Sequence, residues 1–98
     1  MPATISTHVL DVSAGKPAEG VSVSLGPHRK RTDANGRIAD LASVEPGSYE
    51  LVFDLVEYFS GRPHLINKVA LEIRVEEGRH YHVPLLISPF SCSAYRGS

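Results

Sequence analysis

The sequence contains a single cysteine, Cys92, so it can form neither an intrachain disulfide nor a multi-cysteine zinc site. It has no run of about 20 apolar residues, the length that crosses a bilayer as a helix, and its first residues lack the basic and apolar segments of a secretory signal. Neither charge is in excess, since 10 Lys and Arg accompany 11 Asp and Glu. These absences predict a cytoplasmic protein that binds neither membranes nor nucleic acid.

The residues that are present suffice for one small domain covering 1–98, because 42% of them are apolar. A chain of this length buries only about 60–65% of the surface that its unfolded form exposes. Without disulfides or a metal cluster, association with further copies is the usual way to add buried surface. We therefore expect an oligomer.

Short segments in which apolar and polar residues alternate predict a protein built from β-strands. The clearest is 68–75, where every second residue is Val, Leu or Ile. A strand near 5–10 would divide its side chains between two faces, Ile5, Thr7 and Val9 on one and Ser6, His8 and Leu10 on the other. Clusters of Gly, Pro, Asp and Asn separate the segments at short intervals, as in a small β-sandwich or barrel.

Two segments predict departures from regular strands. The apolar residues of 55–59 have helical spacing, with Asp54 in position for an N-cap and Gly61 for a stop, so one short helix is expected. Pro84 lies inside the strand-like segment 80–87 and cannot donate a backbone hydrogen bond. Its presence predicts an edge position or a bulge.

Five histidines are the most conspicuous polar residues. His80 and His82 are two positions apart, so on a strand both imidazoles lie on the same face. Two imidazoles suit a metal ion, but zinc requires at least one more ligand, which His8 would have to supply from another strand. A solvated, polar strand face explains the same spacing and is favoured.

Three further features indicate little by themselves. Arg37 follows the Asn35-Gly36 turn, where loops deliver functional side chains, although an ordinary exposed arginine fits as well. Cys92 has no sequence neighbour that would activate its thiol. The C-terminal segment 89–98 keeps aromatic residues, an arginine and a glycine, whereas chain ends are usually plain.

Three segments together are distinctive: STHVLD at 6–11, HYHVPLL at 80–86 and the C-terminal YRGS at 95–98. In this order they resemble the 5-hydroxyisourate hydrolases, a branch of the transthyretin-like family. TDANGR at 32–37 and GSYELVFD at 47–54 also look like the middle segments of the family, so the likeness covers nearly the whole chain. YRGS is the specific part, since it separates the hydrolases from the hormone-carrying transthyretins. The chain departs from the family pattern at Cys92, at Ala94 and in the short segment 61–67.

The resemblance implies an all-β, transthyretin-like β-sandwich of two four-stranded sheets with one short helix. It also implies a homotetramer, a dimer of dimers joined at strand edges, with active sites in the central channel where subunits meet. The implied reaction is the hydrolysis of 5-hydroxyisourate to 2-oxo-4-hydroxy-4-carboxy-5-ureidoimidazoline during urate breakdown. It requires neither a metal nor an organic cofactor.

The functional residues of the family fall on seven positions of this sequence, namely His8, Arg37, His82 and Ser98 as catalytic residues, and His8, Arg37, Tyr95, Arg96, Gly97 and Ser98 for substrate binding. Histidine suits proton transfer near neutral pH. We expect His82 to act as the general base, with His8 as the alternative, while the other histidine orients water or protonates the leaving nitrogen. Arg37 would stabilise negative charge on the ring oxygens. Ser98 would position substrate or water, and Arg96 would anchor the tail.

Two other functions fit the same scaffold. A non-catalytic carrier would hold a small aromatic ligand in the channel, but it needs a wider and more apolar channel than His8, Arg37, His82 and the YRGS tail provide. A metal-binding or purely structural β-module is the third possibility, which chelators would identify by changing activity or stability.

Overall fold

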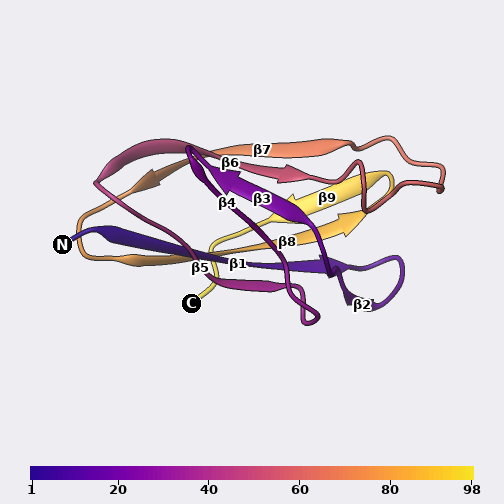
Figure 1. Ribbon diagram of the computed structural model, residues 1–98, viewed down its shortest axis with the longest axis horizontal. Helices are drawn as coiled ribbons and strands as arrows, with labels where there is room; N and C mark the ends of the chain where they lie inside the picture. The colour runs from indigo at the N-terminus through magenta and orange to yellow at the C-terminus, as the bar shows by residue number, and fades with distance from the viewer.

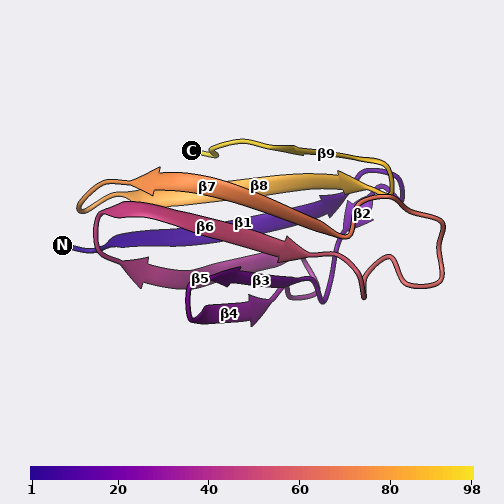
Figure 2. The ribbon, with the colours of Figure 1, turned by 90° about the horizontal axis from the view of Figure 1, so that it is seen from above.

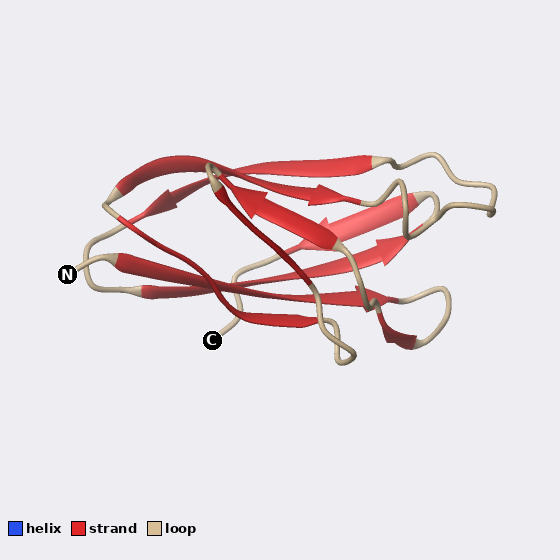
Figure 3. Cartoon of the chain, viewed as in Figure 1, coloured by secondary structure: helices blue, strands red, loops and turns tan.

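The computed structural model describes residues 1–98 and consists of nine strands joined by turns and loops (Figure 3). In chain order the strands are β1 (Ala3–Asp11), β2 (Lys16–Pro17), β3 (Ser22–Leu25), β4 (His28–Arg31), β5 (Arg37–Val44), β6 (Gly47–Asp54), β7 (Lys68–Val75), β8 (His80–Ser88) and β9 (Ser91–Ala94). No helix has the length and apolar character that crossing a membrane requires.

The strands form two sheets that pack face to face as a sandwich (Figure 1). In the first sheet β1 pairs in parallel with β8, and β9 continues the sheet beyond β8. The other edge of β1 is shared by β5 and the two-residue β2. The second sheet has the order β4-β3-β6-β7. The predicted β-sandwich is confirmed, but the first sheet has five strands instead of four because β2 pairs with the end of β1.

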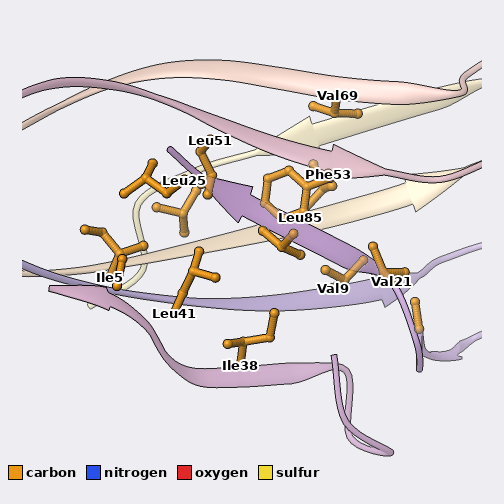
Figure 4. Packing of buried hydrophobic residues seen from close by; sticks show 14 of the residues in the cluster. Ile5, Val9, Val21, Leu25, Ile38, Leu41, Leu51, Phe53, Val69 and Leu85 are labelled. Atoms are coloured by element: carbon orange, nitrogen blue, oxygen red, sulfur yellow. The ribbon is translucent and has the colours of Figure 1, made fainter. Parts of the chain in front are cut away.

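One cluster of 19 buried hydrophobic residues fills the space between the sheets (Figure 4). Ile5 and Val9 of the first sheet and Leu51 and Phe53 of the second are fully buried in it. Removing each such side chain from water contributes about 1.5–3 kcal/mol. Because successive residues of a strand face opposite ways, the burial of alternate residues in β1 turns the intervening ones outward.

The helix expected at 55–59 is absent. Asp54 Oδ1 accepts a hydrogen bond from the N–H of Val56 (3.1 Å), as an N-cap would. Only one bond of the α-helical i→i−4 type follows, from the N–H of Phe59 to the carbonyl of Leu55 (3.0 Å). Forming a single helical turn is unfavourable by itself, because the conformational entropy lost by fixing its dihedral angles exceeds what one hydrogen bond contributes. Burial of Leu55 and Phe59 in the core holds this segment as a turn.

Pro84 lies inside the first sheet and in an unbroken register with β1, so the prediction of an edge position or a bulge was wrong. Its strand, β8, is flanked by β1 and β9. The Pro84 carbonyl accepts the N–H of Tyr95 (3.4 Å), just after β9 has ended at Ala94. The carbonyl and the nitrogen of one strand residue point to the same neighbouring strand, so the nitrogen of Pro84 also points toward Tyr95, beyond the end of β9, and away from β1. The missing proton therefore removes no bond to β1.

Strands β7 and β9 are edge strands on the same side of the sandwich (Figure 2). Between them a cavity of about 520 Å³ opens, and its apolar lining includes Leu71, Ile73, Tyr81 and Val83. Both edges leave backbone donors and acceptors available for a further strand.

Candidate active site

The predicted catalytic residues His8, Arg37 and His82 lie on the outer face of the first sheet, on three adjacent strands. His8 of β1 is directly opposite Arg37 of β5, and Ser6 of β1 is directly opposite His82 of β8. Side chains at directly opposite positions share a face, with Cβ atoms about 4.5–5.5 Å apart in antiparallel pairs. The sheet register thus brings together residues that are as many as 76 positions apart in the chain.

The turn before β5 sets the position of Arg37. The Asp33 carboxylate accepts the backbone N–H groups of Arg37 and Asn35 (both 2.9 Å), and these bonds lower the pKa of Asp33 below its ordinary value. Gly36 has a φ of +74°, and a Cβ there would lie 2.3 Å from the carbonyl oxygen of Val9. Only glycine lets the turn approach β1 this closely.

The same turn orients His8. Its Nε2 is 2.9 Å from the carbonyl oxygen of Asn35. A carbonyl oxygen only accepts, so Nε2 must carry the proton and donate it. In the neutral ring, Nδ1 is then the unprotonated nitrogen. Arg37 beside it is exposed and takes part in no ion pair, so its charge is available to a ligand.

His82 is half-buried, and its Nδ1 lies 2.8 Å from the hydroxyl of Ser6. Burial of the ring, together with the positive charge of Arg37 and the neighbouring rings of His8 and His80, lowers the pKa of His82 below 6.5. The ring is therefore neutral at pH 7. With Nδ1 engaged by Ser6, Nε2 is the nitrogen that remains for proton transfer.

His80 lies on the same face as His82, as its spacing predicts, and both rings contact Ser6. Its Nε2 is 2.9 Å from Ser6 Oγ, and its Nδ1 is 2.7 Å from Thr4 Oγ1. The structure brings together no group of three or more His, Cys, Asp or Glu side chains in a metal-binding arrangement. The two histidines share one hydroxyl partner, Ser6.

The C-terminal tail returns to this face at Gly97. The N–H of Gly97 donates to the carbonyl of His82 (2.7 Å), and a Cβ at position 97 would lie 2.7 Å from His82 Cδ2. Ser98 follows directly and is exposed. The guanidinium of Arg96 lies over the ring of Tyr81, 4.5 Å from its centroid, and donates to the carbonyl of His80 (3.3 Å).

The structure thus divides the tail. Gly97 lies next to His82, with Ser98 following it in the chain, whereas Tyr95 and Arg96 line the cavity between β7 and β9. Two residues that contact the histidines, Ser6 and Thr4, were not among the predicted site residues. Their only signal in the sequence is that they share a strand face with His8.

The HIUase/Transthyretin family model matches residues 5–97. The curated 5-hydroxyisourate hydrolase of Mesorhizobium japonicum is 42% identical over 113 aligned residues, which cover 96% of this chain and 91% of the relative. The solved structure of Klebsiella pneumoniae 5-hydroxyisourate hydrolase has a TM-score of 0.90 and 38% identity, and the match covers 98% of this chain and 99% of that one. Sea bream transthyretin in complex with thyroxine has a TM-score of 0.87 and 26% identity, with 95% and 93% covered.

Proposed function

The chain belongs to the HIUase/transthyretin family, and on that premise we propose that it hydrolyses 5-hydroxyisourate. The observation that carries the proposal is the shared outward face of His8, Arg37 and His82, with the tail packed against His82 at Gly97. Relatives named as hydrolases match nearly the full chain at higher identity than the transthyretin does. The carrier alternative has no comparable support, because this face carries charged and imidazole groups.

In the proposed mechanism His82 is the general base. Its ring is neutral at pH 7 because burial and nearby positive charge lower its pKa. Nε2 removes a proton from water while the water oxygen attacks the ring carbonyl of the substrate. The guanidinium of Arg37 stabilises the negative charge that develops on the carbonyl oxygen. When the carbonyl re-forms, the ring C–N bond breaks, and the leaving nitrogen takes the proton that His82 Nε2 removed from water.

His8 and Ser98 complete the proposed site. The Nε2–H of His8 is bound to the carbonyl of Asn35, which holds the ring beside Arg37 and leaves Nδ1 to orient the attacking water. Ser98 would bind substrate or water through its hydroxyl. Arg96, fixed on Tyr81 and on the carbonyl of His80, would anchor the tail. Tyr95 belongs to the same tail and lines the neighbouring cavity.

We also propose that the protein is a cytoplasmic homotetramer, a dimer of dimers that acts on a small molecule. Support for assembly comes from the unpaired edges of β7 and β9 and from the apolar cavity between them, which a second copy would cover. Support for the compartment comes from Cys92, an exposed thiol that has no partner for an intrachain disulfide.

The direct test is an ultraviolet assay of 5-hydroxyisourate freshly made from urate by urate oxidase. We expect decay faster than the spontaneous reaction, reduced by about 10²–10⁴ in His82→Ala and abolished when residues 95–98 are deleted. His28→Ala, which removes a strand histidine from the other sheet, is the matched control and should retain activity. Decay no faster than the spontaneous rate would overturn the proposal.

A further inference from the structure

A continuous row of hydrogen-bonding side chains runs along the outer face of the first sheet and ends at His82. Thr4 Oγ1 is 2.7 Å from His80 Nδ1, His80 Nε2 is 2.9 Å from Ser6 Oγ, and Ser6 Oγ is 2.8 Å from His82 Nδ1. The parallel register of β1 and β8 builds the row, because it places Thr4 opposite His80 and Ser6 opposite His82. Hydroxyl and imidazole groups alternate along it.

We propose that Ser6 is a positioning residue that holds His82 in the tautomer with its proton on Nδ1 and its lone pair on Nε2, and that His80 and Thr4 fix the direction of the Ser6 hydroxyl. The inference rests on the proposed hydrolase activity, because His82 can take a proton from water at Nε2 only in this tautomer. It adds three residues to the four that the family resemblance assigns to catalysis.

The number of protons limits how the row can be arranged. A hydroxyl donates one proton and accepts others, while a neutral imidazole donates from one nitrogen and accepts at the other. In one arrangement His82 Nδ1–H donates to Ser6, the Ser6 hydroxyl donates to His80 Nε2, and His80 Nδ1–H donates to Thr4. In the other, every donor is reversed and His82 carries its proton on Nε2, where it cannot act as a base.

Each member of the row therefore supports the next. While the Ser6 hydroxyl donates to His80, only its lone pairs face His82 Nδ1, which must then be protonated. Without His80, the Ser6 hydroxyl is free to turn and donate to His82, which favours the unproductive tautomer. Ser6 is only 6% exposed, so water does not readily replace it.

The test combines kinetics with ¹⁵N NMR of the His82 ring, which reports directly which nitrogen carries the proton. We expect Ser6→Ala to lower kcat by about 10- to 100-fold, as when a group that orients a metal-binding histidine is removed. The His82 signals should change from protonated Nδ1 to a mixture of tautomers. Ser6→Thr keeps the hydroxyl and should restore both readouts. Ser43→Ala, an exposed hydroxyl opposite Thr4 on the same face, should change neither.

His80→Ala and Thr4→Val test the rest of the row. We expect a smaller loss of kcat in His80→Ala than in Ser6→Ala, and a smaller one still in Thr4→Val, because each is one bond further from His82. A wild-type ring with its proton on Nε2, or a Ser6→Ala variant with unchanged kcat or unchanged tautomer, would overturn the positioning role. If the wild type fails to hydrolyse 5-hydroxyisourate, the proposed function fails, and the NMR signals still decide the tautomer.

Discussion

The backbone of Gly97 lies directly against the imidazole of His82. Its N–H donates to the carbonyl of the histidine (2.7 Å), and a Cβ would come within 2.7 Å of Cδ2, closer than carbon atoms can pack. Gly97 is not among the glycines with positive φ, so its requirement for glycine is steric and not conformational. The tail can lie on His82 only because residue 97 has no side chain.

Gly97→Ala should therefore reduce activity without unfolding the protein. The added methyl group must displace either the tail or the imidazole, and a displacement of about 1 Å in a catalytic site can lower the rate by about 10²-fold. We expect a loss of this size in kcat/KM, with the thermal unfolding temperature unchanged. Cys92→Ala, in the exposed strand β9, is the control and should behave as wild type. Full activity in Gly97→Ala would mean that the tail leaves His82 during turnover.

The pH at which kcat/KM falls on the acidic side should depend on the charge of Arg37, because that charge lowers the pKa of His82. Burial, Arg37, His8 and His80 lower the pKa of His82, so the neutral base persists below pH 6.5 and the wild-type midpoint should lie there. Arg37→Gln removes one positive charge, which raises the pKa of His82 and moves the midpoint to higher pH, although burial still holds it below 6.5. Arg37→Lys keeps the charge and should keep the wild-type midpoint, whatever rate remains. Identical midpoints in the two variants would exclude Arg37 as a cause.

Alternation in the sequence predicted the strands well because each sheet has one buried and one outward face. Ile5, Thr7 and Val9 share one face as predicted, and that face is buried. The predicted segment 68–75 coincides with β7. The same reasoning failed at 55–59, where helical spacing arises because core residues happen to recur within one turn. Burial in the core, not local helix formation, determines that segment.

Alternation could not predict which residues meet in the site, because it does not show which strands pair or which of their residues lie opposite one another. Ser6 and His82 are 76 positions apart, and only the parallel pairing of β1 with β8 makes them neighbours. Motif resemblance assigned a role to His82, because its residue type is distinctive, but it assigned none to Ser6, a common residue with no distinctive neighbour in the sequence. Sequence likewise could not show that Tyr95 lines the cavity beside β7 while Gly97 contacts His82.

Asp11→Asn should destabilise the protein in a pH-dependent way. Burial alone would raise the pKa of Asp11, but hydrogen bonds from Ser13, Tyr58 and Ala14 outweigh it and lower that pKa below 3.8. The carboxylate therefore stabilises the fold above about pH 3.8, and this contribution disappears as the pH falls through the lowered pKa. At pH 7 we expect a loss of about 1–3 kcal/mol in the free energy of unfolding. Asparagine keeps only one acceptor oxygen, whereas the Asp11 carboxylate accepts from Ser13 and Ala14 at Oδ1 and from Tyr58 at Oδ2.

Urea unfolding of wild type and Asp11→Asn, at one protein concentration and several pH values, measures this contribution. The difference between the two proteins should shrink toward zero at low pH, because the other carboxylates are common to both. Asp40→Asn, on the exposed surface of β5, should match wild type throughout. A difference that is independent of pH would mean that packing, and not charge, stabilises the position.

Ile73→Lys tests whether the β7 and β9 edges hold the tetramer together. Ile73 lines the cavity between these edges and is half-buried in the single chain, so a lysine there can still reach solvent and the fold should survive. Once a second copy covers the cavity, the ammonium group of the lysine would be buried without a partner, which costs about 3–5 kcal/mol.

We expect sedimentation analysis to give four times the 10.6 kDa chain mass for wild type and a smaller species for Ile73→Lys. Leu65→Lys adds the same charge at an exposed loop position and should remain tetrameric. An Ile73→Lys protein with the wild-type mass would place the subunit contacts elsewhere, and a monomeric wild type would reject the assembly itself.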